Sequence, residues 1–189
     1  MSGFISLDCG LPENSNYTES TTGINYISDA SFIETGVSMN VSSVFKTKSL
    51  EEEYYYVRSF LEGVRNCYTI SLTSNTTRYL IRGSFLYGNY DAKRKPPGFD
   101  LHVDANKWDS VNITDESSIS HYEIIHVPKF DYIEVCLVNT GHGIPFISAL
   151  EIRPLKNNIY VTENGSLSTF LRLDYQALFI SLLLNANVG

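Results

Sequence analysis

The chain has 189 residues, enough for one domain with a substantial core, and a net charge of −7. This acidic balance argues against nucleic acid as a partner, because phosphate backbones are bound by basic surfaces. Aromatic residues make up 13% of the chain and charged residues only 19%. Because Tyr combines apolar area with a hydroxyl, a composition rich in Tyr suits half-buried strands and recognition surfaces.

Short segments of β-rich or alternating sequence follow one another along the whole chain, and turn residues such as Pro12, Gly63 and Gly98 separate them. Residues 50–56 have the length for a helical turn, but the Tyr triplet within them favours a strand. Many short strands at such spacing predict an all-β fold, an antiparallel β-sandwich of jelly-roll type. The predicted strands are 4–8, 25–28, 54–60, 67–72, 79–87, 99–104, 110–113, 122–127, 133–138 and 146–153.

Two alternating strands, 79–87 and 99–104, flank a loop that is crowded with aromatic and charged residues. Their period of two predicts a sheet with one buried side. The loop 88–98 lies at a strand edge, where β-sandwiches commonly place recognition residues. Its basic run, Lys93 to Lys95, suits either an acidic partner or plain solvation. We expect Trp108, the one tryptophan, to be a buried anchor.

The three cysteines, Cys9, Cys67 and Cys136, allow at most one internal disulfide and leave one spare thiol. Cys67 and Cys136 lie in separate predicted strands and form the candidate pair, with Cys9 as a competitor for either. The histidines are scattered and no metal-ligand spacing occurs, so we expect neither a metal nor another cofactor. No nucleophile elbow, phosphate loop or evident carboxylate pair appears, which predicts a protein that is not an enzyme.

Five sequons of the form N-x-S/T are candidate N-glycosylation sites and point to a secreted, glycosylated surface. We expect all five in connecting segments rich in Ser, Thr and Gly. The candidate asparagines are Asn16, Asn40, Asn75, Asn112 and Asn164. One feature runs against secretion: residues 1–3 lead straight into a strand without a visible signal peptide. No apolar stretch reaches the length of a membrane span either.

Six segments in order resemble the malectin-like ectodomain of plant leucine-rich-repeat receptor-like kinases. They are GFISLDCGLPENSNYT (3–18), GINYISDASFIETG (23–36), VRSFLEGVRNCYTI (57–70), YLIRGSFLYGNYD with KPPGFDLHVDANKWDSV (79–111), EIIHVPKFDYIEVCLVNTGHGIPFISALEIRPL (123–155) and LRLDY (171–175). The resemblance implies a β-sandwich module at 3–155, the start of a linker or second module at 156–175, and a divergent tail at 176–189. It also implies the extracellular face of the plasma membrane as the location. The family's kinase activity does not carry over, because no residue here matches a kinase motif.

The resemblance implies a ligand-recognition module for a cell-wall carbohydrate or a peptide, with a co-receptor as a further candidate partner. A soluble lectin-like protein and a non-signalling remnant are the alternatives. A sugar pocket needs aromatic faces together with carboxylates or amides, and the candidate residues are Tyr87, Asn89, Tyr90, Asp91, Phe99 and Asp100. The competing interpretation places Tyr87 and Phe99 in the core and gives Asp91 a role in shaping the turn. We expect the loops 88–98 and 139–145 to contact the ligand.

Overall fold

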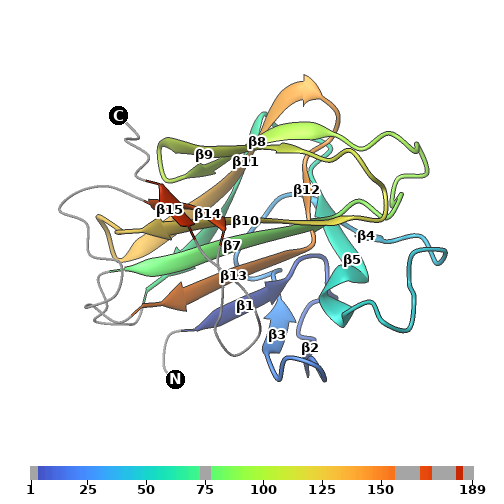
Figure 1. Ribbon diagram of the computed structural model, residues 1–189, viewed down its shortest axis with the longest axis horizontal. Helices are drawn as coiled ribbons and strands as arrows, with labels where there is room; N and C mark the ends of the chain where they lie inside the picture. Colours follow the sequence, from blue (N-terminus) through green and yellow to red (C-terminus); the bar gives the residue numbers. More distant parts are fainter. Residues whose placement is uncertain (1–3, 73–77, 156–166, 172–181, 185–189) are drawn as a thin grey trace.

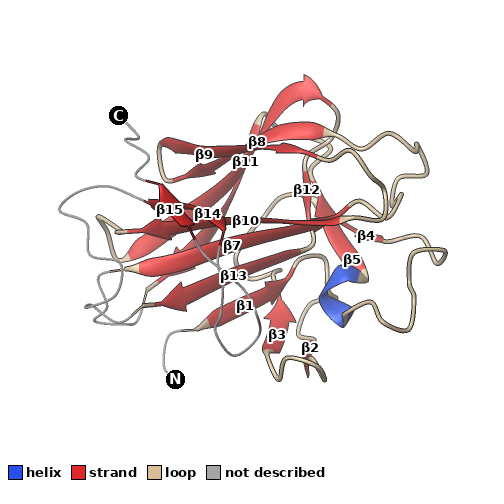
Figure 2. Ribbon diagram, in the orientation of Figure 1, coloured by secondary structure: helices blue, strands red, loops and turns tan. Residues whose placement is uncertain are grey.

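The computed structural model describes residues 4–72, 78–155, 167–171 and 182–184. These residues form strands and one short 3-10 helix (Figures 1 and 2), which confirms the predicted all-β class. The elements are β1 (Ile5–Asp8), β2 (Asn16–Thr18), β3 (Asn25–Ser28), β4 (Val37–Asn40), η1 (Glu52–Tyr54), β5 (Tyr56–Ser59), β6 (Arg65–Ser71), β7 (Tyr79–Leu86), β8 (Gly98–Val103), β9 (Asn106–Asn112), β10 (Ile119–His126), β11 (Tyr132–His142), β12 (Phe146–Ile147), β13 (Ala149–Pro154), β14 (Leu167–Leu171) and β15 (Leu182–Leu184).

The strands form three sheets, and the two larger ones face each other as the layers of a sandwich (Figure 1). The eight-stranded sheet has the order β15-β14-β10-β7-β13-β1-β3-β2, and the four-stranded sheet has the order β6-β11-β8-β9. The third sheet, β12-β5-β4, lies at one end. Neighbouring strands pair in antiparallel fashion except β1 and β3, which run parallel.

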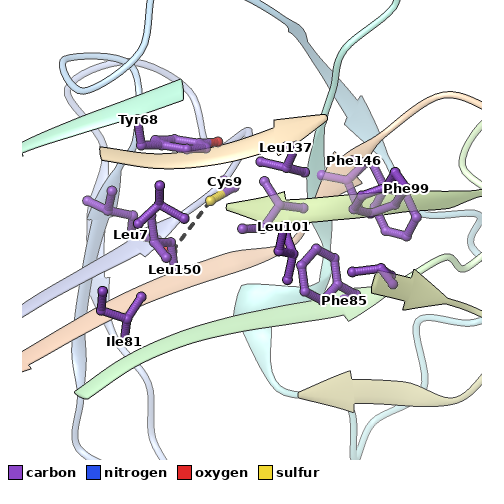
Figure 3. Close-up of a cluster of buried hydrophobic side chains, with 14 of the residues drawn as sticks. Leu7, Cys9, Tyr68, Ile81, Phe85, Phe99, Leu101, Leu137, Phe146 and Leu150 are labelled. Atoms are coloured by element: carbon purple, nitrogen blue, oxygen red, sulfur yellow. Dashed lines mark hydrogen bonds between the residues drawn. The ribbon is translucent and has the colours of Figure 1, made fainter. Parts of the chain in front are cut away.

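The core fills the space between the two layers with large apolar side chains from both (Figure 3). Leu7, Ile81, Phe85 and Leu150 come from the eight-stranded sheet and meet residues such as Leu137 of β11. β8 alternates as predicted: its apolar residues point inward and its polar residues lie half-buried on the outer face. Trp108 is buried as expected, at 8% exposure.

β7 departs from the expectation of one buried side, since all but one of its residues are buried. On its second face Leu80 packs with Ile125 of β10, and the Arg82 guanidinium donates to the Glu123 carboxylate at 2.7 Å. β7 lies between β10 and β13 in the middle of the larger sheet. Alternation alone did not reveal this, because a central strand can be covered on both faces.

The structure corrects the assignment of residues 50–56, which contain the 3-10 helix η1, and the strand β5 begins only at Tyr56. Tyr54 is buried in the core, and the buried Glu53 accepts a hydrogen bond from the Tyr26 hydroxyl at 3.4 Å. These tertiary contacts override the β preference of the Tyr triplet. The predicted strand 146–153 is also two strands, divided at Ser148, whose hydroxyl accepts from the Leu86 backbone nitrogen at 3.0 Å.

Short edge strands are the elements that the sequence pattern missed. β2 and β4 have only three and four residues and are mostly exposed, so they carry little alternation. The segments 156–166, 172–181 and 185–189 lie outside the described residues, so the proposed boundaries at 155 and 175 remain predictions. Between those segments, β14 pairs with β10 and lies next to β15, the edge strand of the larger sheet.

The cysteines are divided as one disulfide and one buried thiol. Cys67 of β6 lies directly opposite Cys136 of β11, and a disulfide joins them. Cys9 is buried and reduced within the core, where its thiol lies 3.9 Å from the Leu7 carbonyl oxygen (Figure 3). Burial raises the pKa of the Cys9 thiol well above its usual range, so it remains a protonated core residue.

In the described part of the chain, no helix has the length and apolarity of a membrane span.

Candidate ligand-binding loops

The loop after β7 begins at a glycine that no other residue replaces without strain. Gly88 has a φ of +48°, and a Cβ there would lie 2.3 Å from a methyl group of Val41. Its backbone nitrogen donates to the Glu116 carbonyl at 2.8 Å, and its carbonyl accepts from the Ser42 nitrogen at 3.0 Å. The loop is therefore fixed to neighbouring segments at its first residue.

Side chains inside the loop hold its backbone in an unusual conformation. Asn89, Ala92 and Arg94 have φ values of 49°, 59° and 52°. The Asn89 carbonyl oxygen accepts from the Arg94 backbone nitrogen at 2.9 Å, and Asp91 accepts from the Lys93 backbone nitrogen at 3.1 Å. Positive φ at residues other than glycine persists only where surrounding contacts impose it, and such residues cluster at functional sites.

The three candidate aromatic residues lie in the core beneath the loop. Tyr87, Tyr90 and Phe99 are 0%, 8% and 2% exposed. Their rings surround Phe146 of β12, at centroid distances of 6.1, 5.0 and 6.0 Å respectively. The rings pack edge-to-face or tilted against one another and are buried, so they offer no open platform to a sugar. The structure thus gives Tyr87 and Phe99 the core role that the competing interpretation assigned to them.

The Tyr87 hydroxyl links this core to the loop, whereas the Tyr90 hydroxyl accepts from the Ser59 hydroxyl at 3.3 Å. The Tyr87 hydroxyl donates to the Asp91 carboxylate and accepts from the Lys95 backbone nitrogen at 3.2 Å. Burial and the Asp91 contact raise the pKa of Tyr87. Burial raises the pKa of Tyr90 to about 12, so both hydroxyls stay protonated near neutral pH. Asp91 therefore shapes the turn, as the competing interpretation proposed.

Asp100 is separated from the other candidates by its position on the outer face of β8. Its carboxylate accepts from the Ser110 hydroxyl at 2.7 Å and pairs with the Lys107 ammonium at 2.9 Å. Partial burial raises the pKa of Asp100, but the Lys107 and Ser110 hydrogen bonds outweigh this and lower the pKa below its usual value. The structure joins five of the six candidates and leaves Asp100 outside that group.

The second predicted loop, at the end of β11, lies directly against the first. The Thr140 hydroxyl donates to the Gly98 carbonyl at 3.2 Å, and His142 is the register partner of Gly98. Gly143 has a φ of +112°, and a Cβ there would lie 2.6 Å from the Pro97 Cβ. The two loops therefore form one continuous surface at the same end of the molecule.

The exposed part of this surface is cationic. Residues Ala92 to Lys95 are exposed, and 63% of the Lys93 side chain is open to solvent. The Lys93 ammonium lies 3.9 Å from the Asp91 carboxylate, which is a loose pairing. A fixed backbone thus presents Lys93, Arg94 and Lys95 to solvent on a chain whose net charge is −7.

A separate small hollow of about 220 Å³ lies beside β2 and β3 and was not anticipated. Its lining combines polar residues such as Ser15, Asn16 and Ser28 with the apolar Ile27 and Ala30. No sequence pattern indicated this hollow, because β2 itself was not predicted. Among the described residues, no cluster of His, Cys, Asp and Glu is arranged to hold a metal ion.

A family model for the malectin-like domain matches residues 7–182. The chain belongs to the malectin-like domain family. A probable LRR receptor-like serine/threonine-protein kinase of Arabidopsis thaliana is 51% identical over 176 residues, covering 93% of this chain and 20% of the relative. The LRR receptor-like serine/threonine-protein kinase IOS1 of the same plant is 47% identical, covering 93% of this chain and 19% of the relative. This malectin-like chain thus spans about a fifth of the length of these relatives.

Solved structures show that the malectin-like fold extends to much more distant relatives. The ANX2 ectodomain from Arabidopsis thaliana superposes with a TM-score of 0.73 at 18% identity, covering 90% of this chain and 48% of that one. A chain in the crystal structure of plant peptide RALF23 in complex with FER and LLG2 superposes with a TM-score of 0.67 at 14% identity, covering 89% of this chain and 47% of that one. At such identities the likeness shows the fold alone.

Proposed function

We propose that this malectin-like module is the recognition part of a receptor-like kinase and binds an acidic peptide segment at the extracellular side. The surface formed by the 88–98 and 139–145 loops is the binding site. The observation that carries the proposal is the cationic run Lys93 to Lys95, held on a fixed backbone at the tip of the first loop. Loops on a rigid β-scaffold are where binding residues concentrate.

The chemistry of this surface favours a peptide over a sugar. A pyranose needs an open aromatic face, and the aromatic rings beneath the loop are buried against Phe146. Lys93, Arg94 and Lys95 instead suit carboxylates, which Arg and Lys bind through charge-assisted hydrogen bonds. The complex of peptide RALF23 with FER and LLG2 supports a peptide ligand for this fold, with a further protein as co-receptor.

Two synthetic peptides of equal length, one rich in Asp and Glu and one rich in Lys, test the proposal by fluorescence anisotropy. The acidic peptide should bind and the basic one should not, and added salt should weaken binding because exposed charges are screened. The paired variant Lys93→Ser with Lys95→Ser should weaken binding about 2- to 30-fold, from roughly 0.2–1 kcal/mol for each exposed charge. Lys48→Ser with Lys129→Ser, at exposed positions elsewhere, removes equal charge and should leave affinity unchanged.

A glycan array supplies the competing result for carbohydrate recognition. If the module ignores both peptides but binds a defined oligosaccharide with an affinity that the Lys93 and Lys95 changes do not alter, the peptide proposal is wrong. Equal loss of peptide binding in the loop pair and in the Lys48 and Lys129 pair would also refute it. Such a result would mean that net charge, rather than this loop, attracts the peptide.

A further inference from the structure

The described sequons share a place in the fold that the sequence could not show. Asn16 lies on β2, Asn40 on β4 and Asn112 on β9. These are edge strands of the eight-stranded, the three-stranded and the four-stranded sheet respectively. Among the described strands, those in the interior of a sheet contain no sequon, although they hold most of the strand residues. This corrects the expectation that the sequons lie in connecting segments; Asn75 and Asn164 fall outside the described residues.

Each of the three asparagines is exposed and lies at the end of its strand. Asn16 is the first residue of β2, whereas Asn40 and Asn112 are the last residues of β4 and β9. The Asn40 carbonyl oxygen accepts from the Lys46 ammonium at 3.2 Å, which orients the amide and leaves its nitrogen Nδ2 for another bond. An oligosaccharide attached at any of these positions would extend into solvent beside an open strand edge.

In the four-stranded and three-stranded sheets, the chain itself covers the edge opposite the strand that carries the sequon. At β6 the Thr69 backbone nitrogen donates to the Phe32 carbonyl at 3.0 Å, so another segment lies along that edge. β12 has only two residues and turns into β13, where the Ser148 nitrogen donates to the Ser84 carbonyl at 3.0 Å. For β2 and β4, the described residues provide no comparable backbone cover. β9 meets a side chain, the Tyr122 hydroxyl, 3.4 Å from the Asn112 backbone nitrogen.

An uncovered edge strand exposes unpaired backbone groups and can pair with a strand of another molecule. Natural proteins reduce this hazard by covering the edge or placing charge on it. β2 and β4 carry no charged residue. On β4, moreover, Val37 is 42% exposed. Their protection must therefore come from something other than charged side chains on those strands.

We propose that N-linked glycans on Asn16 and Asn40 shield the open edges β2 and β4, that a glycan on Asn112 adds to the charged side chains already present on the β9 edge, and that together they keep the module from pairing edge to edge. In this modification Nδ2 bonds to the anomeric carbon of a lipid-linked oligosaccharide pyrophosphate. The pyrophosphate leaves, and the amide loses one proton. The glycans replace the covering segment that these edges lack. The edges β6 and β12 need no glycan, because the chain already covers them. The proposal does not depend on which ligand the loops bind.

The test uses the full chain, secreted from a eukaryotic cell behind an added signal peptide. Peptide mass mapping should find glycans at all three asparagines. The triple variant Asn16→Gln, Asn40→Gln and Asn112→Gln should lose the monomer peak in size-exclusion chromatography with light scattering. The control variant Asn106→Gln changes an asparagine of the same edge strand β9 that lies outside any sequon, and this variant should remain monomeric. All variants keep the Asn75 and Asn164 sequons, so any glycan there is a constant background.

A rescue experiment separates edge pairing from a general loss of solubility. Asn40→Gln alone, which removes the glycan from the β4 edge, should already reduce the monomer, and Val37→Lys, which places a charge on that edge, should restore it. Val127→Lys adds the same charge at a residue of similar exposure, 37%, outside the strands, and should not. If the triple variant is not secreted, endoglycosidase trimming of the folded glycoprotein replaces it and should cause the same loss of monomer. Empty sequons at all three positions, or a trimmed protein that stays monomeric, would overturn the proposal.

Discussion

Asp8, the last residue of β1, is a fully buried carboxyl that should make the module less stable as pH rises. Its Oδ2 accepts a hydrogen bond from the Tyr17 hydroxyl at 2.9 Å, whereas its Oδ1 is buried with no partner among the described residues. Burial raises the pKa of Asp8 to about 8, and the nearby carboxylates of Asp29, Glu53 and Glu52 add to the effect. The folded state therefore retains a proton that the unfolded chain releases near its ordinary pKa of about 3.9.

The sign and size of the effect follow from this difference in bound protons. The stability contributed by protonated Asp8 is fully present below about pH 4 and is lost as pH rises toward about 8. One proton corresponds to about 1.4 kcal/mol per pH unit, so between pH 6.5 and 8 the free energy of unfolding should fall by about 2 kcal/mol. Burial lowers the pKa of His126, which acts in the opposite direction but mainly below about pH 6.5.

Urea unfolding at several pH values between 6.5 and 8 measures this slope. Asp8→Asn cannot ionise and should remove most of it; a smaller slope should remain, because burial raises the pKa of Glu53 to about 7. Asp131→Asn changes an exposed carboxylate and should keep the wild-type slope. If Asp8→Asn unfolds with the same pH dependence as the wild type, Asp8 is ionised in the folded state and the reasoning fails.

Three further changes test the core and the cross-links by urea unfolding. Phe146→Ala should lower the free energy of unfolding by about 3–5 kcal/mol, because it leaves a cavity among four packed aromatic rings. A decrease below about 1 kcal/mol would contradict the central place of Phe146 in this cluster. Arg58→Ala should cost about 3–5 kcal/mol, since it leaves the buried Asp29 carboxylate without its cation, and a neutral effect would show that Asp29 is uncharged. Reducing the Cys67–Cys136 disulfide, which spans 69 residues, should cost about 4 kcal/mol; an unchanged midpoint would argue that the bond is absent.

The sequence predicted the strands whose periodicity matches their environment. β8 alternates in sequence and in burial, because one face meets the core and the other carries polar side chains. β7 alternates less clearly and is buried on both faces, since neighbours in the sheet cover its second side. That distinction depends on the order of strands in the sheet, and strand order is set by contacts between residues far apart in the chain.

Composition singled out the candidate loop, but it did not indicate which of the loop's side chains are buried. Tyr90 belongs to a run of mostly polar residues that suggests an exposed loop. Its ring nevertheless packs against Phe146 of β12, in the three-stranded sheet. A residue type at a strand end indicates which chemistry is available and not which way the side chain points. The direction is decided by the space left between the sheets, which no local pattern records.

Burial of these rings nevertheless has a consequence for recognition at the loop. The Tyr87 hydroxyl reaches from the core to Asp91 and Lys95, and thereby connects the rigid interior to the backbone that carries the cations. Positive φ at Ala92 and Arg94 costs on the order of 1–3 kcal/mol each, which a loop without such anchors would relax. A ligand that meets a loop already fixed in this way loses less entropy on binding. In the binding mode proposed above, the aromatic residues would support the loop from beneath the surface by holding the charged groups in place.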